Sequence, residues 1–306
     1  MAQNETPIIL DETEQKIINI IDAHRDQIID FAKDIYAHAE LGYKEFRTAE
    51  KFANFMKDLG LPTKEHLAVT GVKAYLNEEK KDNVSLALIG ELDALRIPEH
   101  KYANPETQGA HCCGHHAQLA GVIGAAIALT NPEVKEKLDG QVVLFAVPAE
   151  EYGEIEFKNK LTDEGKIKYG SGKCELIRIG AFDDIDLDIV HHIGDKDISG
   201  GSTDVGDVQH IQPVLTFNTG GKVSGLHSVD FDIVDDELAY VVTAKIFALS
   251  AYRLLKNGAE KAKEVVENYH PIFTKDAYIQ YMNSFISVEG GSPTEINAPR
   301  GCAVIL

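Results

Sequence analysis

The stretch GAHCCGHHAQLAG, residues 109–121, places three histidines and two cysteines between His111 and His116, immediately before an apolar run that predicts a helix. Cys113 and His115 stand two residues apart where the loop joins this helix, so their side chains can converge on one point. A metal ion and a helix N-terminus both favour a thiolate at such a position. The alternative is a buried turn in which the cysteine is a small hydrophobic residue.

Two further clusters of polar residues follow apolar runs that predict buried strands. GQVVLFAVPAEE ends in Glu150 and Glu151, and DIDLDIVHHIG carries His191 and His192 near its end. Neighbouring glutamates at a strand end diverge, so that one can bind a metal ion while the other faces a water molecule as a general base. His227 precedes the last long helix. These residue types could ligate a pair of divalent transition-metal ions with one position left open for water.

Each feature also has a purely structural interpretation. A histidine at a strand end is commonly a hydrogen-bonded structural residue, and Cys112 is expected to be a packed thiol. Asp204 and Asp207 could accept hydrogen bonds from metal ligands, or could bind only the backbone of their own turn. Ligand-type residues at three consecutive strand ends are harder to explain without metal, because buried charges need partners.

The order of the predicted elements indicates how these residues are positioned. Residues 12–60 contain two helical patterns, and TGVKAYLN and NVSLALIGELDAL predict strands, the second with Glu91 and Asp93 at its carboxyl end. Further buried strands alternate with helices. This alternation predicts a three-layer α/β/α architecture with a central, mostly parallel sheet. In open α/β sheets the functional groups collect beyond the carboxyl ends of the strands.

The composition excludes several classes of protein. The chain has 306 residues and a formal net charge of -19, which argues against binding to nucleic acid or to an anionic membrane surface. No apolar run approaches the length needed to span a bilayer, and no secretory signal is visible at the N-terminus. We therefore expect a cytoplasmic protein. Its four cysteines are expected to be reduced thiols.

Six motifs carry a resemblance to a known family. HAELGYKEFRTAE, GELDAL, HCCGHHAQLAG, VPAEEY, FDDIDLDIVHH and GGSTDVGDV occur in the order, and with roughly the spacing, of the metal-dependent amidohydrolase and peptidase family. That family includes aminoacylases, auxin-conjugate amidohydrolases and aminobenzoyl-glutamate hydrolases. The sequence is most similar to the last two branches, which use a CGH motif with a cysteine ligand. The resemblance covers about residues 12–285 and implies a zinc-exopeptidase-like catalytic domain.

The resemblance also implies a role for each candidate residue. It implies two divalent metal ions, zinc or manganese, bridged by the thiolate of Cys113, with Glu150 as the general base. Asp93 would be an acid that orients a metal ligand. The remaining ligands that it implies are His115, Glu151, His192 and His227. The second histidine of FDDIDLDIVHH stands at the ligand position, so His192 is preferred to His191.

One departure from the family pattern concerns a second domain. The family inserts a lid domain between the strand that bears His192 and the GGSTDVGDV loop, whereas only residues 193–200 fill this gap here. We therefore expect one catalytic domain at residues 1–288, without the lid, followed by a tail at residues 289–306. The lid normally supplies the dimer interface, so a monomer is expected.

The expected activity is hydrolysis of amide bonds in small molecules. The candidate substrates are N-acyl amino acids, dipeptide-like molecules and aminobenzoyl-glutamate. Turnover is expected to suffer from the missing lid, which supplies groups that stabilise the reacting carbonyl. The alternatives are a natural or engineered lidless scaffold that binds metal without catalysis, and an α/β protein whose histidines and cysteines only pack.

Overall fold

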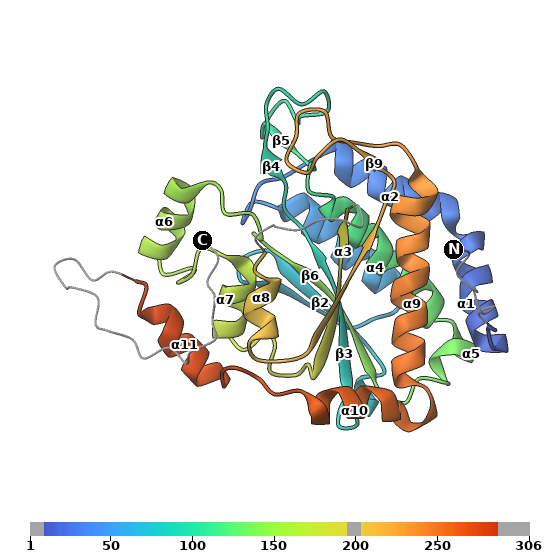
Figure 1. The fold of residues 1–306 in the computed structure, drawn as a ribbon. Helices are drawn as coiled ribbons and strands as arrows, with labels where there is room; N and C mark the ends of the chain where they lie inside the picture. The colour runs from blue at the N-terminus through green and yellow to red at the C-terminus, as the bar shows by residue number, and fades with distance from the viewer. Residues whose placement is uncertain (1–8, 195–202, 287–306) are drawn as a thin grey trace, which may run out of the picture.

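The computed structural model describes residues 9–194 and 203–286. A sheet runs through its centre (Figure 1). This sheet has six strands in the order β1-β2-β6-β3-β7-β8. Strands β6, β3, β7 and β8 are parallel, whereas β2 pairs antiparallel with both β1 and β6. The strands are β1 (Thr63–Leu67), β2 (Gly71–Leu76), β3 (Ser85–Glu91), β6 (Gln141–Val147), β7 (Leu187–Ile193) and β8 (Val214–Thr219).

Helices cover both faces of this sheet, which confirms the predicted three-layer α/β/α architecture (Figure 1). One face is covered by α1 (Glu12–Ala23), α2 (Arg25–Ala37), α3 (Phe46–Asp58), α4 (His115–Leu129), α5 (Pro132–Lys135), α9 (Val242–Leu255) and α10 (Glu260–Asn268). The other is covered by α6 (Ile155–Asp163), α7 (Gly172–Arg178), α8 (Val205–Gln209) and α11 (Lys275–Asn283). Two small hairpins, β4 (Leu95–Arg96) with β5 (Gly109–Ala110) and β9 (Lys222–Val223) with β10 (Asp232–Ile233), lie outside the main sheet.

The central strands are buried along their whole length. Every residue of β3 and of β6 is buried, as expected for parallel strands with helices on both faces. In the parallel register Glu91 pairs with Val147, and Ile89 pairs with Val190. The carboxyl ends of β3, β6 and β7 therefore lie at one edge of the sheet.

Helix α4 is entirely buried and packs closely against α9. A Cβ atom at Gly121 would lie 2.5 Å from Cγ2 of Thr243, and one at Gly124 would lie 2.5 Å from Cβ of Ala244. Such separations are too short for a real side chain, so the two glycines permit the close approach of the helices. This packing fixes α4, which begins at His115.

The first of the two predicted helical patterns, at residues 12–40, forms two helices in the structure, α1 and α2. The chain leaves helical geometry at His24, between α1 and α2, where φ is -107° and ψ is 14°. Nδ1 of His24 lies 2.8 Å from the carbonyl oxygen of Ile20, so this side chain binds one of the last carbonyls of α1. The apolar periodicity of residues 12–40 continues across the break, and for this reason the pattern did not reveal it.

One helical stretch bears on the expectation that no segment could span a bilayer. A π-helical turn, η2 (Glu237–Val241), continues into α9, and together they are long and apolar enough to cross a membrane. More than half of this stretch is buried within the fold. The stretch packs against α4, and we therefore interpret it as a core helix.

Two sequence predictions fall largely outside the described residues. The gap in which the lid domain is expected, residues 193–200, is described only as far as Gly194. The predicted tail at residues 289–306 lies wholly outside them. The single-domain arrangement therefore stays a prediction.

Candidate metal centre

Carboxylates and histidines meet where three parallel strands end. Glu91 is the last residue of β3, and Glu150 and Glu151 follow the end of β6. His192 lies near the end of β7, and His115 is the first residue of α4. Side chains from four elements thus converge on one edge of the sheet, where the sequence predicted a functional site.

The cysteine side of this centre consists of Cys113, Glu151 and His227, whose ligand atoms all lie within 4.8 Å of one another. Nε2 of His227 is 3.2 Å from Oε1 of Glu151. The hydrogen bond to Cys113, followed by that to Glu151, raises the pKa of His227 to about 10. Burial alone would raise the pKa of Glu151, but His227 holds it below its usual range. A thiol, a carboxylate and an imidazole in this arrangement form a typical zinc ligand set.

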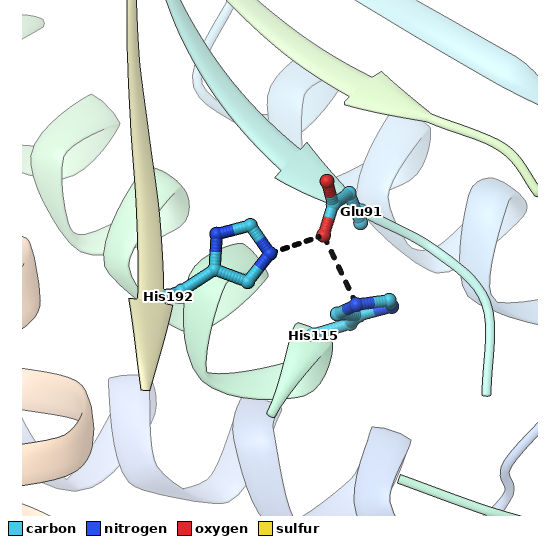
Figure 2. Close-up of side chains that lie close together, drawn as sticks. All are labelled: Glu91, His115 and His192. Atoms are coloured by element: carbon cyan, nitrogen blue, oxygen red, sulfur yellow. Dashed lines mark ion pairs between the residues drawn. The ribbon is translucent and has the colours of Figure 1, made fainter. Parts of the chain in front are cut away.

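The histidine side consists of Glu91, His115 and His192, whose ligand atoms also lie within 4.8 Å of one another. Figure 2 shows the Glu91 carboxylate facing both imidazole rings. Its Oε2 atom is 3.0 Å from Nε2 of His115 and 3.4 Å from Nε2 of His192. Burial would lower the pKa of His115, but the charge of Glu91 outweighs it and holds this pKa well above its usual range.

Glu150 lies between the two sides. One of its carboxylate oxygens is 3.7 Å from Nε2 of His115, and it forms a further group with His115 and Glu151 within 4.8 Å. Burial, followed by the charge of Glu91, raises the pKa of Glu150 to about 9. A divalent cation next to Glu150 would lower this pKa again, because a nearby positive charge favours the carboxylate.

Asp93 contacts a residue of each side. Its backbone oxygen is 2.8 Å and its Oδ1 atom is 3.2 Å from Nδ1 of His115. Its Oδ2 atom accepts a hydrogen bond of 2.9 Å from the backbone N–H of Glu151. With Nδ1 held in this way, Nε2 of His115 points into the centre. These contacts hold the ring of His115, and the role of Asp93 in orienting a metal ligand stays a prediction.

The loop that presents the two glutamates is strained and held in place by Glu45. Ala149 has a left-handed conformation with φ of 49°, which is uncommon for a residue with a side chain. The backbone N–H of Ala149 donates a hydrogen bond of 2.8 Å to the buried carboxylate of Glu45. Burial, followed by the charge of Asp93, raises the pKa of Glu45 to about 8. The turn at Ala149 sends Glu150 and Glu151 to different parts of the centre.

The neighbouring histidines and Cys112 lie elsewhere. His191 points into the core, where its Nε2 atom is 2.7 Å from Oγ1 of Thr219. The alternation of side chains along β7 explains why His192 and not His191 faces Glu91. The rings of His111 and His116 contact each other at a tilt of 49°, with centroids 5.3 Å apart, and neither residue belongs to the two ligand groups. Cys112 is fully buried in the hydrophobic core.

Sequence reasoning missed four residues of this centre. Glu91 was visible as an acid at a strand end, but no motif indicated that it faces the histidines. Glu45 lies in the motif HAELGYKEFRTAE, but the motif did not indicate its contact with Ala149. Asp204 was considered as an acceptor for metal ligands, whereas its partners are Lys173 and Ser171. Nothing in the sequence linked Lys173 to the site, because its partners are distant in the chain.

The residues present fit a pair of divalent cations. Within the described part of the chain, Nε2 of His115 is buried and has no well-aligned hydrogen-bond partner. Oε1 of Glu151 is likewise buried, and Nε2 of His227, 3.2 Å away, is poorly aligned with it. Buried polar atoms whose hydrogen-bonding capacity is not fully used are rare, and here each lies among thiol, imidazole and carboxylate groups. Two adjacent groups of this composition are what a binuclear metal centre requires.

Comparison with known families identifies the family. Residues 87–299 match the profile of Peptidase family M20/M25/M40, and the chain belongs to this family. This confirms the resemblance seen in the sequence motifs.

Curated relatives match over part of their length. IAA-amino acid hydrolase ILR1-like 2 of Arabidopsis thaliana is 29% identical over 175 residues, which are 55% of this chain and 38% of the relative. A p-aminobenzoyl-glutamate hydrolase chain of Escherichia coli is 27% identical over 182 residues, which are 58% of this chain and 34% of the relative. The matched regions thus span little more than a third of these relatives.

Solved structures share the fold. The YXEP protein of Bacillus subtilis, described as a dinuclear metal binding peptidase, superposes with a TM-score of 0.62 and 15% identity over 76% of this chain and 98% of that chain. The glutaminyl cyclase of Macrostomum lignano has a TM-score of 0.52 and 13% identity over 84% of this chain and 97% of that chain. At these identities the likeness is one of fold alone.

Proposed function

We propose that this chain is a two-metal hydrolase of amide bonds that acts on N-acyl amino acids, dipeptide-like molecules or aminobenzoyl-glutamate. The observation that carries the proposal is the position of Glu150 between two ligand groups, with His115 and Glu151 within 4.8 Å. The names of the relatives support the substrate class, since they include an IAA-amino acid hydrolase and a p-aminobenzoyl-glutamate hydrolase.

The chemistry follows from the side chains around Glu150. Bound divalent cations would polarise the amide carbonyl and lower the pKa of a water molecule. The carboxylate of Glu150 takes the proton of the attacking water and returns it to the departing amine nitrogen. Asp93 keeps His115 oriented through its contacts with Nδ1. Glu45 holds the backbone of Ala149, which presents Glu150.

The ligand types bear on which metals are bound. We propose zinc on the cysteine side, because a thiolate is a soft ligand that zinc prefers over manganese. Imidazole and carboxylate ligands on the histidine side suit either zinc or manganese.

We further propose a lidless monomer. Residues 194–204 are the whole connection between β7 and α8, so this connection is too short to hold a domain that makes dimer contacts. The side chain of His227 is 51% exposed, so water reaches this residue of the cysteine side, although Cys113 itself is buried. This exposure favours a second candidate function, a metal-binding protein with little turnover, because efficient sites exclude water.

Hydrolysis and metal content measured on one sample test the proposal. Wild type should contain about two metal ions per chain and hydrolyse members of a panel of N-acyl amino acids until a chelator is added. Glu150→Gln should keep both ions while kcat falls by about 10²- to 10⁴-fold, because only the proton transfer is removed. Two ions without turnover in wild type would favour the second candidate, and no bound metal would refute both.

A further inference from the structure

A buried lysine lies next to the histidine side and is not explained by the proposed reaction. Lys173, in α7, is fully buried, and its ammonium group forms ion pairs with Glu91 and with Asp204, the residue before α8. Burial of an ammonium is costly, so a side chain in this position needs partners that hold it in place. Helices from one face of the sheet thus reach the ligands at its edge.

The two oxygens of the Glu91 carboxylate have different partners. Oε1 accepts a hydrogen bond from the ammonium of Lys173. Oε2 accepts one of 2.8 Å from the side chain of Gln118 and faces Nε2 of His115 and Nε2 of His192. The backbone N–H of Glu91 donates to the same Gln118 side chain, also at 2.8 Å. The carboxylate is therefore held in one orientation, with Oε2 directed at the imidazoles (Figure 2).

The lysine is itself anchored through Asp204. One oxygen of Asp204 is 2.5 Å from Nζ of Lys173, and the other accepts hydrogen bonds from the backbone N–H of Lys173 at 2.9 Å and from Oγ of Ser171 at 2.5 Å. Carboxylate oxygens of Glu91, Asp204 and Glu150 lie within 4.8 Å of one another. The ammonium offsets the mutual repulsion of these carboxylates, which would otherwise push Glu91 away.

We propose that Glu91 is a metal ligand together with His115 and His192, and that Lys173, anchored by Asp204, is the residue that positions it. The inference rests on the proposed two-metal centre. It adds Glu91 to the histidine side as a ligand, whereas the family resemblance did not include Glu91 among the metal ligands. Lys173 does not touch substrate in this arrangement and acts only through Glu91.

The positioning role predicts a direction of change that a simple charge effect does not. Lys173→Met removes a positive charge near a cation site, so by Coulomb's law alone the variant would bind metal more tightly. Loss of positioning has the opposite effect, and loss of a residue that orients a ligand typically weakens metal binding by about 10- to 100-fold.

The test is a titration of chelator-treated protein with Co²⁺, followed by the number of ions bound and by the thiolate-to-cobalt charge-transfer absorption that reports on Cys113. We expect wild type to bind about two ions, and Glu91→Gln to bind about one while keeping the charge-transfer absorption. Lys173→Met should weaken the same ion by at least about tenfold. Lys73→Met is the matched control, because Lys73, on β2, is another buried lysine and pairs with Asp184.

Each outcome decides the proposal. Two ions bound to Glu91→Gln with unchanged affinity, or tighter binding by Lys173→Met, would overturn it while leaving the two-metal centre intact. Absence of Co²⁺ binding in wild type would refute the proposed function as well. If Lys173→Met does not fold, as judged by its circular dichroism, the isosteric variants Glu91→Gln and Asp204→Asn still decide, since both should weaken the ion on the histidine side.

Discussion

Asp93 shows how one carboxylate can control two ligands. Its two oxygens face the backbone N–H of Glu151 and Nδ1 of His115, both of which are donors when Nε2 of His115 is free for metal. In Asp93→Asn the amide NH₂ must replace one of these oxygens, and a donor would then face a donor. We expect metal affinity to fall by about 10- to 100-fold, measured by competition with a chromogenic chelator.

Asp188→Asn is the control for this substitution. Asp188 is as deeply buried as Asp93 but accepts its hydrogen bond from Gln212, and it lies near the start of β7, whereas the ligands lie at the carboxyl ends of the strands. We expect its metal affinity to equal that of wild type. Equal losses in the two variants would show that general destabilisation, and not the contacts of Asp93, weakens binding.

The pKa of His227 predicts how the stability of the metal-free protein depends on pH. In the folded chain this pKa is raised from 6.5 to about 10, first by the hydrogen bond to Cys113 and then by that to Glu151. A raised pKa contributes stability that is complete below pH 6.5 and is lost as the pH rises through about 10. The raised pKa of Glu150, about 9, acts in the same direction.

We therefore expect the melting temperature of chelator-treated protein to fall between about pH 6.5 and 10. His227→Gln should flatten this dependence, although the side chain is half exposed and solvent screens part of the effect. Bound metal replaces the proton on the imidazole and should flatten it too. A melting temperature that rises over this pH range would contradict the assignment.

At the scale of elements, the contact between α4 and α9 positions the ligands at the start of α4. A Cβ atom added at Gly124 would lie 2.5 Å from Cβ of Ala244 and 2.8 Å from Cδ1 of Ile28. Both atoms belong to packed helices that must move apart. We expect Gly124→Ala to lower the free energy of unfolding by about 1–3 kcal/mol, as measured by urea denaturation.

Gly206→Ala provides the comparison. Gly206 also lies in a helix, α8, but no atom lies within 4 Å of the position that its Cβ would take. Alanine favours helices over glycine, so this variant should be neutral or up to about 1 kcal/mol more stable. A Gly124→Ala variant as stable as Gly206→Ala would mean that α4 and α9 can separate at no cost.

The same elements show what the sequence could and could not predict. Buried strands that end in acids or histidines predicted the parallel sheet, its functional edge and the approach of His192 to His115. Side-chain alternation settles the choice against His191 only once the face of β7 is known. Lys173 and Asp204 reach Glu91 from helices on the opposite face of the sheet from α4, and no local pattern encodes such a contact. Likewise, the break at His24 leaves the apolar periodicity unchanged.

At the scale of the whole molecule, charge links metal binding to stability. The chain carries a formal net charge of -19, and several of its buried carboxylates are gathered at the candidate centre. Lys173 offsets only part of this local charge. Two divalent cations would offset much of the remaining negative charge. We therefore expect bound metal to add to the free energy of unfolding that the hydrophobic core supplies.

Removal of metal should therefore lower the melting temperature markedly. A ligand present at 100 times its dissociation constant stabilises the folded state by about 2.7 kcal/mol, so two ions contribute about 5 kcal/mol. For a domain of this size that corresponds to a shift of roughly 10 °C or more, measured by calorimetry with and without chelator. Mg²⁺ at the same concentration controls for screening of the net charge. Thiolate and imidazole are poor ligands for Mg²⁺, so this ion should restore little of the lost stability. If Mg²⁺ restored the full melting temperature, the effect would be one of ionic strength, and the thiol and imidazole groups gathered at Cys113, His115, His192 and His227 would have no specific part in it.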